Sequence, residues 1–194
     1  MAQIFGNFLE SQGSQEYLII GFSPSSIPLQ QRWRNNGLSA DFLADYLTTF
    51  FPAYEISSPE RQAEIKDAVA YIANELLENA MKYSYEPAKH PVSIGLHLET
   101  NELRFYVTNQ VDPTTIPSFQ QFIQELLTED PNDMYIRQIE ASADEENTPT
   151  SHLGFLTMLT DYDAELAWKF EVVPNDVPHI AVTIMVKLVI QKSA

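Results

Sequence analysis

The sequence predicts an α+β fold: a two-layer sandwich in which helices cover one face of a mixed, mostly antiparallel sheet. Three observations predict it. Segments with strand character and segments with helical periodicity follow one another in the order strand, two helices, two strands, helix, loop, helix and two strands. Two of the strand pairs are consecutive and are joined by short polar segments, as in antiparallel hairpins. The length of 194 residues allows one domain, residues 1–194, with a single core.

The first half of the chain contains one predicted strand and two predicted helices. Residues Glu16–Phe22 form an aliphatic and aromatic run that ends at a Ser-Pro-Ser-Ser cluster, which is the pattern of a strand followed by a turn. Apolar residues then recur at helical spacing over Ala40–Phe51. A longer helix is predicted to begin near Ser58 and to run to about Tyr85, because Ser is a favoured N-cap and Pro59 suits the first helical position.

The second half is predicted to contain a hairpin, a helix, a loop, a short helix and a closing strand pair. In chain order the regular elements are Val92–Glu99, Leu103–Asn109, Phe119–Thr128, Leu153–Leu159, Glu165–Val173 and His179–Gln191. Between the two helices, residues 129–151 are rich in acidic residues, Asn and Pro around one apolar patch, Met134 to Ile139. This composition predicts a mobile loop that contains at most one short helical turn.

The charge of the chain disfavours two classes of partner. Eleven Lys and Arg residues stand against 27 Asp and Glu residues, which gives a net charge of −16. A surface this negative repels phosphate backbones and anionic lipid headgroups, so we expect neither a nucleic acid nor a membrane as partner. The N-terminal residues show no basic stretch followed by an apolar one, and the longest apolar runs of the chain are too short to span a bilayer, so we expect a cytoplasmic protein.

One face of the long predicted helix carries residues suited to chemistry. At about 100° per residue, Glu75, Asn79 and Lys82 fall within about 60° of each other, beside an apolar stripe. The amide oxygen could hold a hydrated Mg2+, the carboxylate could orient an attacking hydroxyl, and the lysine could neutralise a phosphate. Polar residues at this spacing also occur on the solvated face of any amphipathic helix, so spacing alone leaves both interpretations open.

The segment that contains these residues resembles a known motif. ELLENAMKYS, Glu75–Ser84, is similar to the N-box of the Bergerat-fold (GHKL) ATPases and kinases, and the predicted element order is similar to that fold. The resemblance implies that Asn79 ligates the Mg2+ that bridges the phosphates of ATP, and that Glu75 acts as general base. It also implies that Lys82 and Tyr83 lie near the nucleotide.

Two further motifs of that superfamily match this chain in single residues. The superfamily has Asp-x-Gly-x-Gly after the second sheet strand, where the Asp accepts a hydrogen bond from the adenine amine; this chain has Asn109-Gln110-Val111-Asp112-Pro113, which implies that Asn109 takes that role. A glycine-rich lid hinge then leads into a phosphate-binding helix. Here that place holds Thr150-Ser151-His152-Leu153-Gly154-Phe155, which implies that His152 and Gly154 lie near a phosphate.

The C-terminal third of the chain resembles one branch of the superfamily in particular. Asp161-Tyr162 followed by Leu166–Phe170 is similar to the SiaB-like proteins, which are related to the anti-sigma-factor serine kinases. This resemblance implies a bacterial regulatory protein that binds ATP with Mg2+ and phosphorylates a Ser or Thr of a small partner protein in a partner-switching signalling pathway. The alternative, favoured by the missing glycines, is a degenerate, non-catalytic member that binds nucleotide weakly or not at all and serves as a protein-interaction module. A homodimer is compatible with both.

Overall fold

The computed structural model describes the chain in nine segments. They are residues 2–11, 16–23, 28–29, 33–52, 56, 58–85, 90–144, 153–173 and 179–190, with residues 33–34 and 141–144 described for the backbone only. None of the helices within these segments is both long and apolar enough to cross a bilayer. His152, which the resemblance places near a phosphate, lies outside the described residues.

Six strands form one sheet in the described part of the chain, and every neighbouring pair is antiparallel. The strands are β1 (Gln3–Phe5), β2 (Glu16–Phe22), β3 (Val92–Leu98), β4 (Glu102–Val111), β5 (Glu165–Val173) and β6 (His179–Val189). Their order across the sheet is β1-β5-β6-β4-β3-β2, so β6 lies between β5 and β4. The sheet is thus antiparallel throughout these strands, where the sequence predicts a mixed, mostly antiparallel one.

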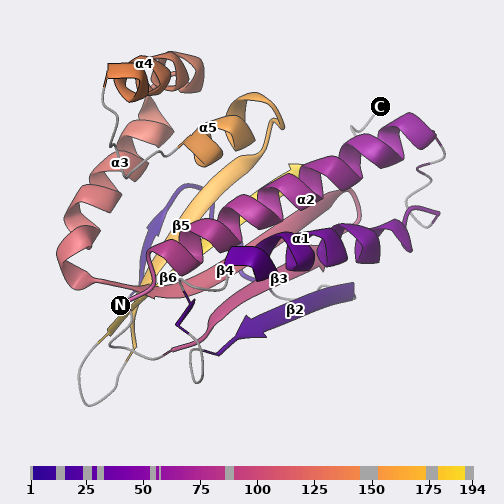
Figure 1. The fold of residues 1–194 in the computed structure, drawn as a ribbon, viewed down its shortest axis with the longest axis horizontal. Helices are drawn as coiled ribbons and strands as arrows, with labels where there is room; N and C mark the ends of the chain where they lie inside the picture. Colours follow the sequence, from indigo (N-terminus) through magenta and orange to yellow (C-terminus); the bar gives the residue numbers. More distant parts are fainter. Residues whose placement is uncertain are drawn as a thin grey trace.

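The helices cover one face of this sheet, which confirms the predicted α+β sandwich (Figure 1). They are α1 (Trp33–Thr48), α2 (Pro59–Lys82), α3 (Ile116–Thr128), α4 (Pro131–Asp144) and α5 (Leu153–Thr160), with a 3-10 turn at Pro113–Thr115 before α3. α1 and α2 pack against each other above β2, β3 and β4. α3 and α5 extend the layer over β5, where Phe119 contacts Phe170 and Phe155 contacts Trp168 edge to face.

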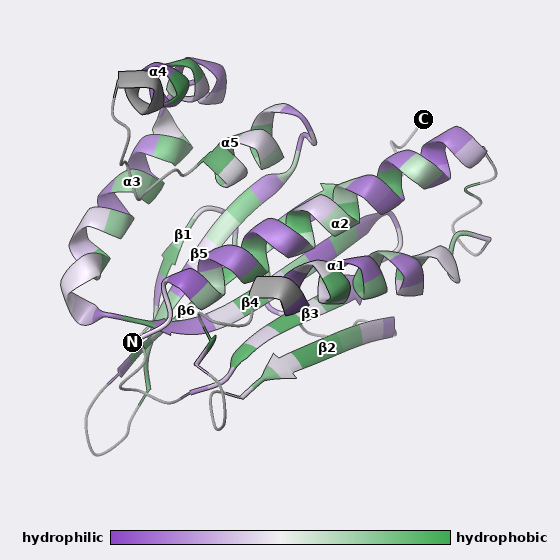
Figure 2. Cartoon of the chain, viewed as in Figure 1, coloured by the Kyte–Doolittle hydropathy of each residue, from purple (hydrophilic) through white to green (hydrophobic). Residues whose placement is uncertain are grey.

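The long helix α2 provides the centre of the core. Ser58 caps it, its hydroxyl oxygen accepting from the Arg61 N–H at 3.5 Å, and Pro59 occupies its first turn, as the sequence predicts. The apolar stripe on its inner side is buried against the sheet: Ile65, Val69, Ile72 and Leu76. Figure 2 shows the result, with apolar segments of α2 toward the sheet and hydrophilic ones outward. Tyr83 follows the last residue of α2 as its C-cap and is 36% exposed.

The predicted loop over 129–151 is wrong for most of its length, because Pro131–Asp144 is a helix. The Asp130 carboxylate accepts from the backbone N–H of Asn132 at 2.8 Å and of Asp133 at 3.4 Å, which satisfies two amides that have no partner within the helix. Met134 is buried in the main core, and α4 packs against α5. An acidic cap followed by proline is therefore a helix start signal here, although the composition resembles that of a loop.

The N-terminal residues form a short strand and then cross the outer face of the sheet. β1 pairs with β5 at one edge, a contact that three residues are too few to reveal as a pattern. Beyond it, Phe8 and Leu9 pack on Tyr106, Ala167 and Met185, and the Tyr106 hydroxyl donates to the Leu9 carbonyl at 2.8 Å. This segment covers part of the face that the helices leave open.

Candidate functional site

A cavity of about 370 Å³ lies between the C-terminal part of α2 and the inner face of the sheet. Its apolar walls come from α2, β4, α3, α5 and β6: Ala80, Val111, Phe119, Phe155, Val182 and Ile184. Its described polar lining consists of Asn79, Tyr83, Asn109, Thr115 and Ser118. Small-molecule sites commonly have this size, apolar walls and a few polar groups that fix the orientation of the ligand.

The end of α2 brings two of the predicted residues to the cavity. Asn79 and Tyr83 are four positions apart, so they lie on the same side of the helix, one turn from each other. Asn79 is half-buried, and its carbonyl accepts from the Tyr83 N–H at 3.0 Å, the last bond of the helix. Because the helix ends here, the Tyr83 side chain lies at the mouth of the cavity and is partly exposed.

The third predicted residue reaches the same cavity from the sheet. Successive side chains of β4 alternate between the two faces, and Val107, Asn109 and Val111 share the inner one. Asn109 is only 3% exposed, so its amide is a buried polar group that lines the cavity. Its Nδ2 donates to the Gln110 carbonyl at 3.5 Å, at the outer limit for a hydrogen bond. The structure therefore brings Asn79, Tyr83 and Asn109 together.

Glu75 and Gly154 form a second contact, next to the cavity. A Cβ at Gly154 would lie 2.1 Å from Glu75 Oε2, so the carboxylate occupies the space where any other residue would have a side chain. Gly154 is the second residue of α5, and the following residue, Phe155, lines the cavity. Burial, with a smaller contribution from the negative charge of Glu78, raises the pKa of Glu75 above its usual range.

A tyrosine one turn before Glu75 also connects α2 to α5. Tyr71 hydrogen-bonds the Thr157 side chain, and its ring packs on that of Tyr162 with the centroids 5.2 Å apart. Burial raises the pKa of Tyr71, so its hydroxyl stays protonated at neutral pH. These contacts hold α5 beside the Glu75 carboxylate.

Lys82 does not line the cavity in the described structure. Its side chain is exposed, its Nζ lies 5.2 Å from the centroid of the Tyr83 ring, and it is absent from the described lining of the cavity. The proximity of Lys82 to a nucleotide therefore stays a prediction from the resemblance. The same holds for His152, about which the described residues say nothing.

Several lining residues were not identified as site residues from the sequence. Thr115 and Ser118 come from the turn into α3, and Val182 and Ile184 from the inner face of β6, opposite Asn109 and Val107 in register. The alternation within β6 indicates which of its residues face the helices. Nothing local indicates that this face lies beside Asn109, because the pairing joins segments far apart in the chain.

The donor set fits a magnesium ion only in combination with oxygens from a ligand. Asn79 offers one amide oxygen, and the described lining residues include no carboxylate. Within the described segments, no three His, Asp or Glu side chains are arranged to hold a metal by themselves. Mg2+ commonly takes one or two protein oxygens, several waters and the phosphates of its nucleotide, so Asn79 is a suitable ligand when a nucleotide supplies the rest.

No protein-family model matches this sequence, and a search of curated proteins finds no significant match.

Proposed function

We propose that the chain binds Mg-ATP in the cavity between α2 and the sheet and phosphorylates a Ser or Thr of a small regulatory partner protein. One observation supports this more than any other. Asn79 and Asn109 were selected from separate motifs, in a helix and a strand, and both line the same cavity. A pair of unrelated solvated residues would have no reason to converge on one concave, mostly apolar site.

In this proposal each residue has a defined task. Asn109 and the apolar walls hold the base, and Asn79 provides the protein oxygen for Mg2+. The ion, when bound with the nucleotide, neutralises charge on the phosphates. Glu75 accepts the proton of the Ser or Thr hydroxyl as its oxygen forms a bond to the γ-phosphorus, while the bond from that phosphorus to ADP breaks. A pKa raised by burial makes Glu75 a stronger base than an exposed carboxylate.

Nucleotide binding is tested by thermal unfolding of the apo protein and of the protein with Mg-ADP. Ligand at about 100 times its dissociation constant adds roughly 2.7 kcal/mol, which raises Tm by roughly 5 to 10 °C for a chain of this size. Asn79→Ala should reduce the shift in Mg-ADP. The matched control is Asn74→Ala, which removes a half-buried amide from the same helix but not from the cavity lining. No shift at millimolar nucleotide would refute the proposal.

Phosphoryl transfer is tested separately, with γ-labelled ATP and an array of Ser- and Thr-containing peptides. The wild type should label peptides in a Mg2+-dependent reaction. Glu75→Gln keeps the size of the side chain but cannot accept the proton, so it should lose at least a hundredfold in labelling rate while keeping the Mg-ADP shift in Tm. Equal labelling by both proteins would exclude Glu75 as the base.

A specific observation favours the alternative function, a non-catalytic interaction module. α1 exposes two large apolar side chains one turn apart, Leu38 (71% exposed) and Phe42 (54%), which is more apolar surface than a solvated helix needs. A small or absent Tm shift with Mg-ADP, together with no labelled peptide, would favour this alternative. Loss of self-association in Phe42→Ser, measured by analytical ultracentrifugation, would then identify this surface of α1 as the interface of a homodimer.

A further inference from the structure

The described polar groups that line the cavity share one chemical property. Asn79 and Asn109 carry amides, while Tyr83, Thr115 and Ser118 carry hydroxyls, and none of the five is charged at neutral pH. An amide presents one acceptor oxygen and two donor protons, and a hydroxyl can both donate and accept. The lining therefore offers donors and acceptors side by side, in contrast to a carboxylate, which only accepts, or an ammonium, which only donates.

Asn109 is the most buried of these groups, and its amide retains most of its hydrogen-bonding capacity. Its one hydrogen bond within the described structure uses a single Nδ2 proton and is 3.5 Å long. The second Nδ2 proton and the Oδ1 atom stay available to a ligand. Because the bond to Gln110 is at the limit of hydrogen-bond geometry, turning the amide over would lose little. Asn109 can thus present either an acceptor or a donor at a given point of the cavity.

The two purine bases carry hydrogen-bonding groups of opposite kind at position 6. Adenine carries an amine that donates, and guanine carries a carbonyl that accepts. A buried amide can satisfy both, whereas a buried carboxylate would be left facing the guanine carbonyl oxygen, acceptor against acceptor. We propose that the cavity binds guanine nucleotides as well as adenine nucleotides, and that Asn109 is the residue that permits both. This inference rests on the proposed nucleotide binding.

The first experiment uses the wild-type chain and titration calorimetry with Mg-ADP, Mg-GDP and the Mg-diphosphate of purine riboside, which has no group at position 6. ADP and GDP should bind with dissociation constants within about threefold of each other. The third nucleotide should bind at least fivefold more weakly, because the Asn109 amide then loses a partner. ADP binding with GDP at least tenfold weaker would overturn the inference and leave the proposed function intact. Failure of all three to bind would refute the proposed function itself.

The second experiment converts the amide to a carboxylate. At pH 8, Asn109→Asp should weaken GDP binding at least tenfold relative to ADP, because at position 6 adenine presents a donor to the carboxylate and guanine presents an acceptor. Asn101→Asp, in the exposed turn between β3 and β4, adds the same charge away from the cavity and should leave the ratio unchanged. An unchanged ratio in Asn109→Asp would show that Asn109 does not read the base. If that variant fails to fold, Asn109→Leu replaces it and should weaken both nucleotides equally; unequal weakening would overturn the inference.

Discussion

The contact between Glu75 and Gly154 can be tested through the stability of the protein. In Gly154→Ala, the new Cβ would lie 2.1 Å from Glu75 Oε2, against an ordinary contact of at least 3.4 Å, so the carboxylate oxygen must move by 3.4 − 2.1 = 1.3 Å. All three atoms near the new Cβ belong to the Glu75 side chain, so the backbone need not shift. A side-chain rotation of roughly 30° costs about 0.5–1.5 kcal/mol.

The same substitution also has a favourable effect. Ala favours a helix over Gly by up to about 1 kcal/mol, so in the wild-type background the two effects nearly cancel. In a Glu75→Ala background the steric cost is absent, and Gly154→Ala should stabilise the protein by about 1 kcal/mol. The double-mutant cycle therefore predicts a coupling free energy of about 1 kcal/mol between the two positions.

Denaturant unfolding of the four proteins at equal m-value measures this coupling. As a second readout, Tm of Gly154→Ala should rise by roughly 2–4 °C in the Glu75→Ala background and stay nearly constant in the wild type. Distant, independent positions add within about 0.3–0.5 kcal/mol. A coupling inside that range would refute the contact, and with it the idea that the absence of a side chain at 154 positions the Glu75 carboxylate.

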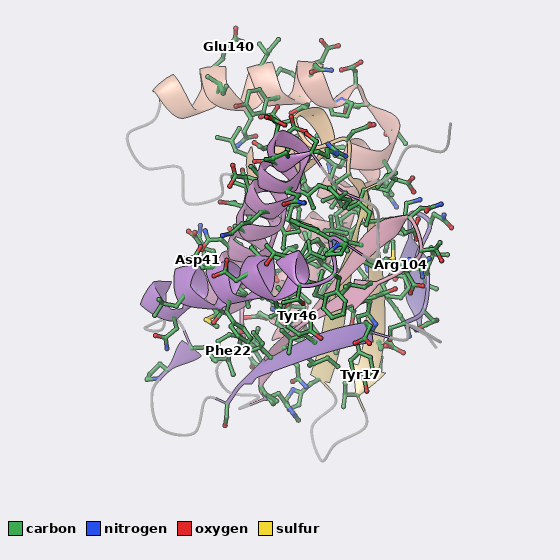
Figure 3. All side chains as sticks on the ribbon, turned by 90° about the vertical axis from the view of Figure 1, so that its right-hand side faces the viewer. Tyr17, Phe22, Asp41, Tyr46, Arg104 and Glu140 are labelled. Carbon is green, nitrogen blue, oxygen red and sulfur yellow. The ribbon has the colours of Figure 1, made fainter. Side chains whose placement is uncertain are left out.

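Three further predictions concern pH and capping. Because the pKa of Glu75 is raised in the folded state, that state binds more protons than the unfolded state between the two pKa values, and ionised Glu75 destabilises the fold at neutral pH. Glu75→Gln should therefore raise Tm at pH 7, and this gain should vanish near pH 4. As a control, Glu140→Gln, on the outer side of α4 (Figure 3), should change Tm little. Burial lowers the pKa of His97, so the unfolded state binds more protons below about pH 6.5 and the free energy of unfolding falls as pH drops. His97→Gln should flatten the dependence of that free energy on pH between pH 7 and 5, and an unchanged dependence would contradict this. Asp130→Ala removes the cap of α4 and should lower its stability by about 1 kcal/mol. Relative to the wild type, hydrogen exchange should then speed up more for the α4 amides than for the α2 amides, and an equal change in both helices would show that the cap does not hold α4.

The elements that were predicted well are those whose signals are local. The bounds of β2 and β5 were predicted from apolar runs that end in turn residues, and the start of α2 from Ser58 and Pro59. α4 was missed because the acidic residues, Asn and Pro around its one apolar patch resemble the composition of a loop, whereas its packing against α5 is a tertiary contact. Tertiary contacts override composition in such segments.

For the candidate site, too, local signals identify single residues, but tertiary contacts decide how those residues are grouped. Glu75, Asn79 and Lys82 could be selected from residue type and spacing, because a helix repeats every 3.6 residues, whereas Asn109 was selected from the resemblance alone. Their grouping was not deducible from this period. Asn79 and Asn109 share a cavity, Lys82 is absent from its described lining, and Glu75 instead contacts Gly154.

The sequence by itself determined most of the helices and strands, with α4 and β1 as the exceptions, because periodicity, caps and turn residues act within a few positions of the chain. It also assigned most of the predicted site residues to α2 and to the end of β4. Only the tertiary structure decided that these two places face each other across a cavity, which β6 and the start of α3 complete. Those neighbours are brought together by antiparallel pairing and core packing over long sequence separations, and such contacts leave no local pattern in the chain.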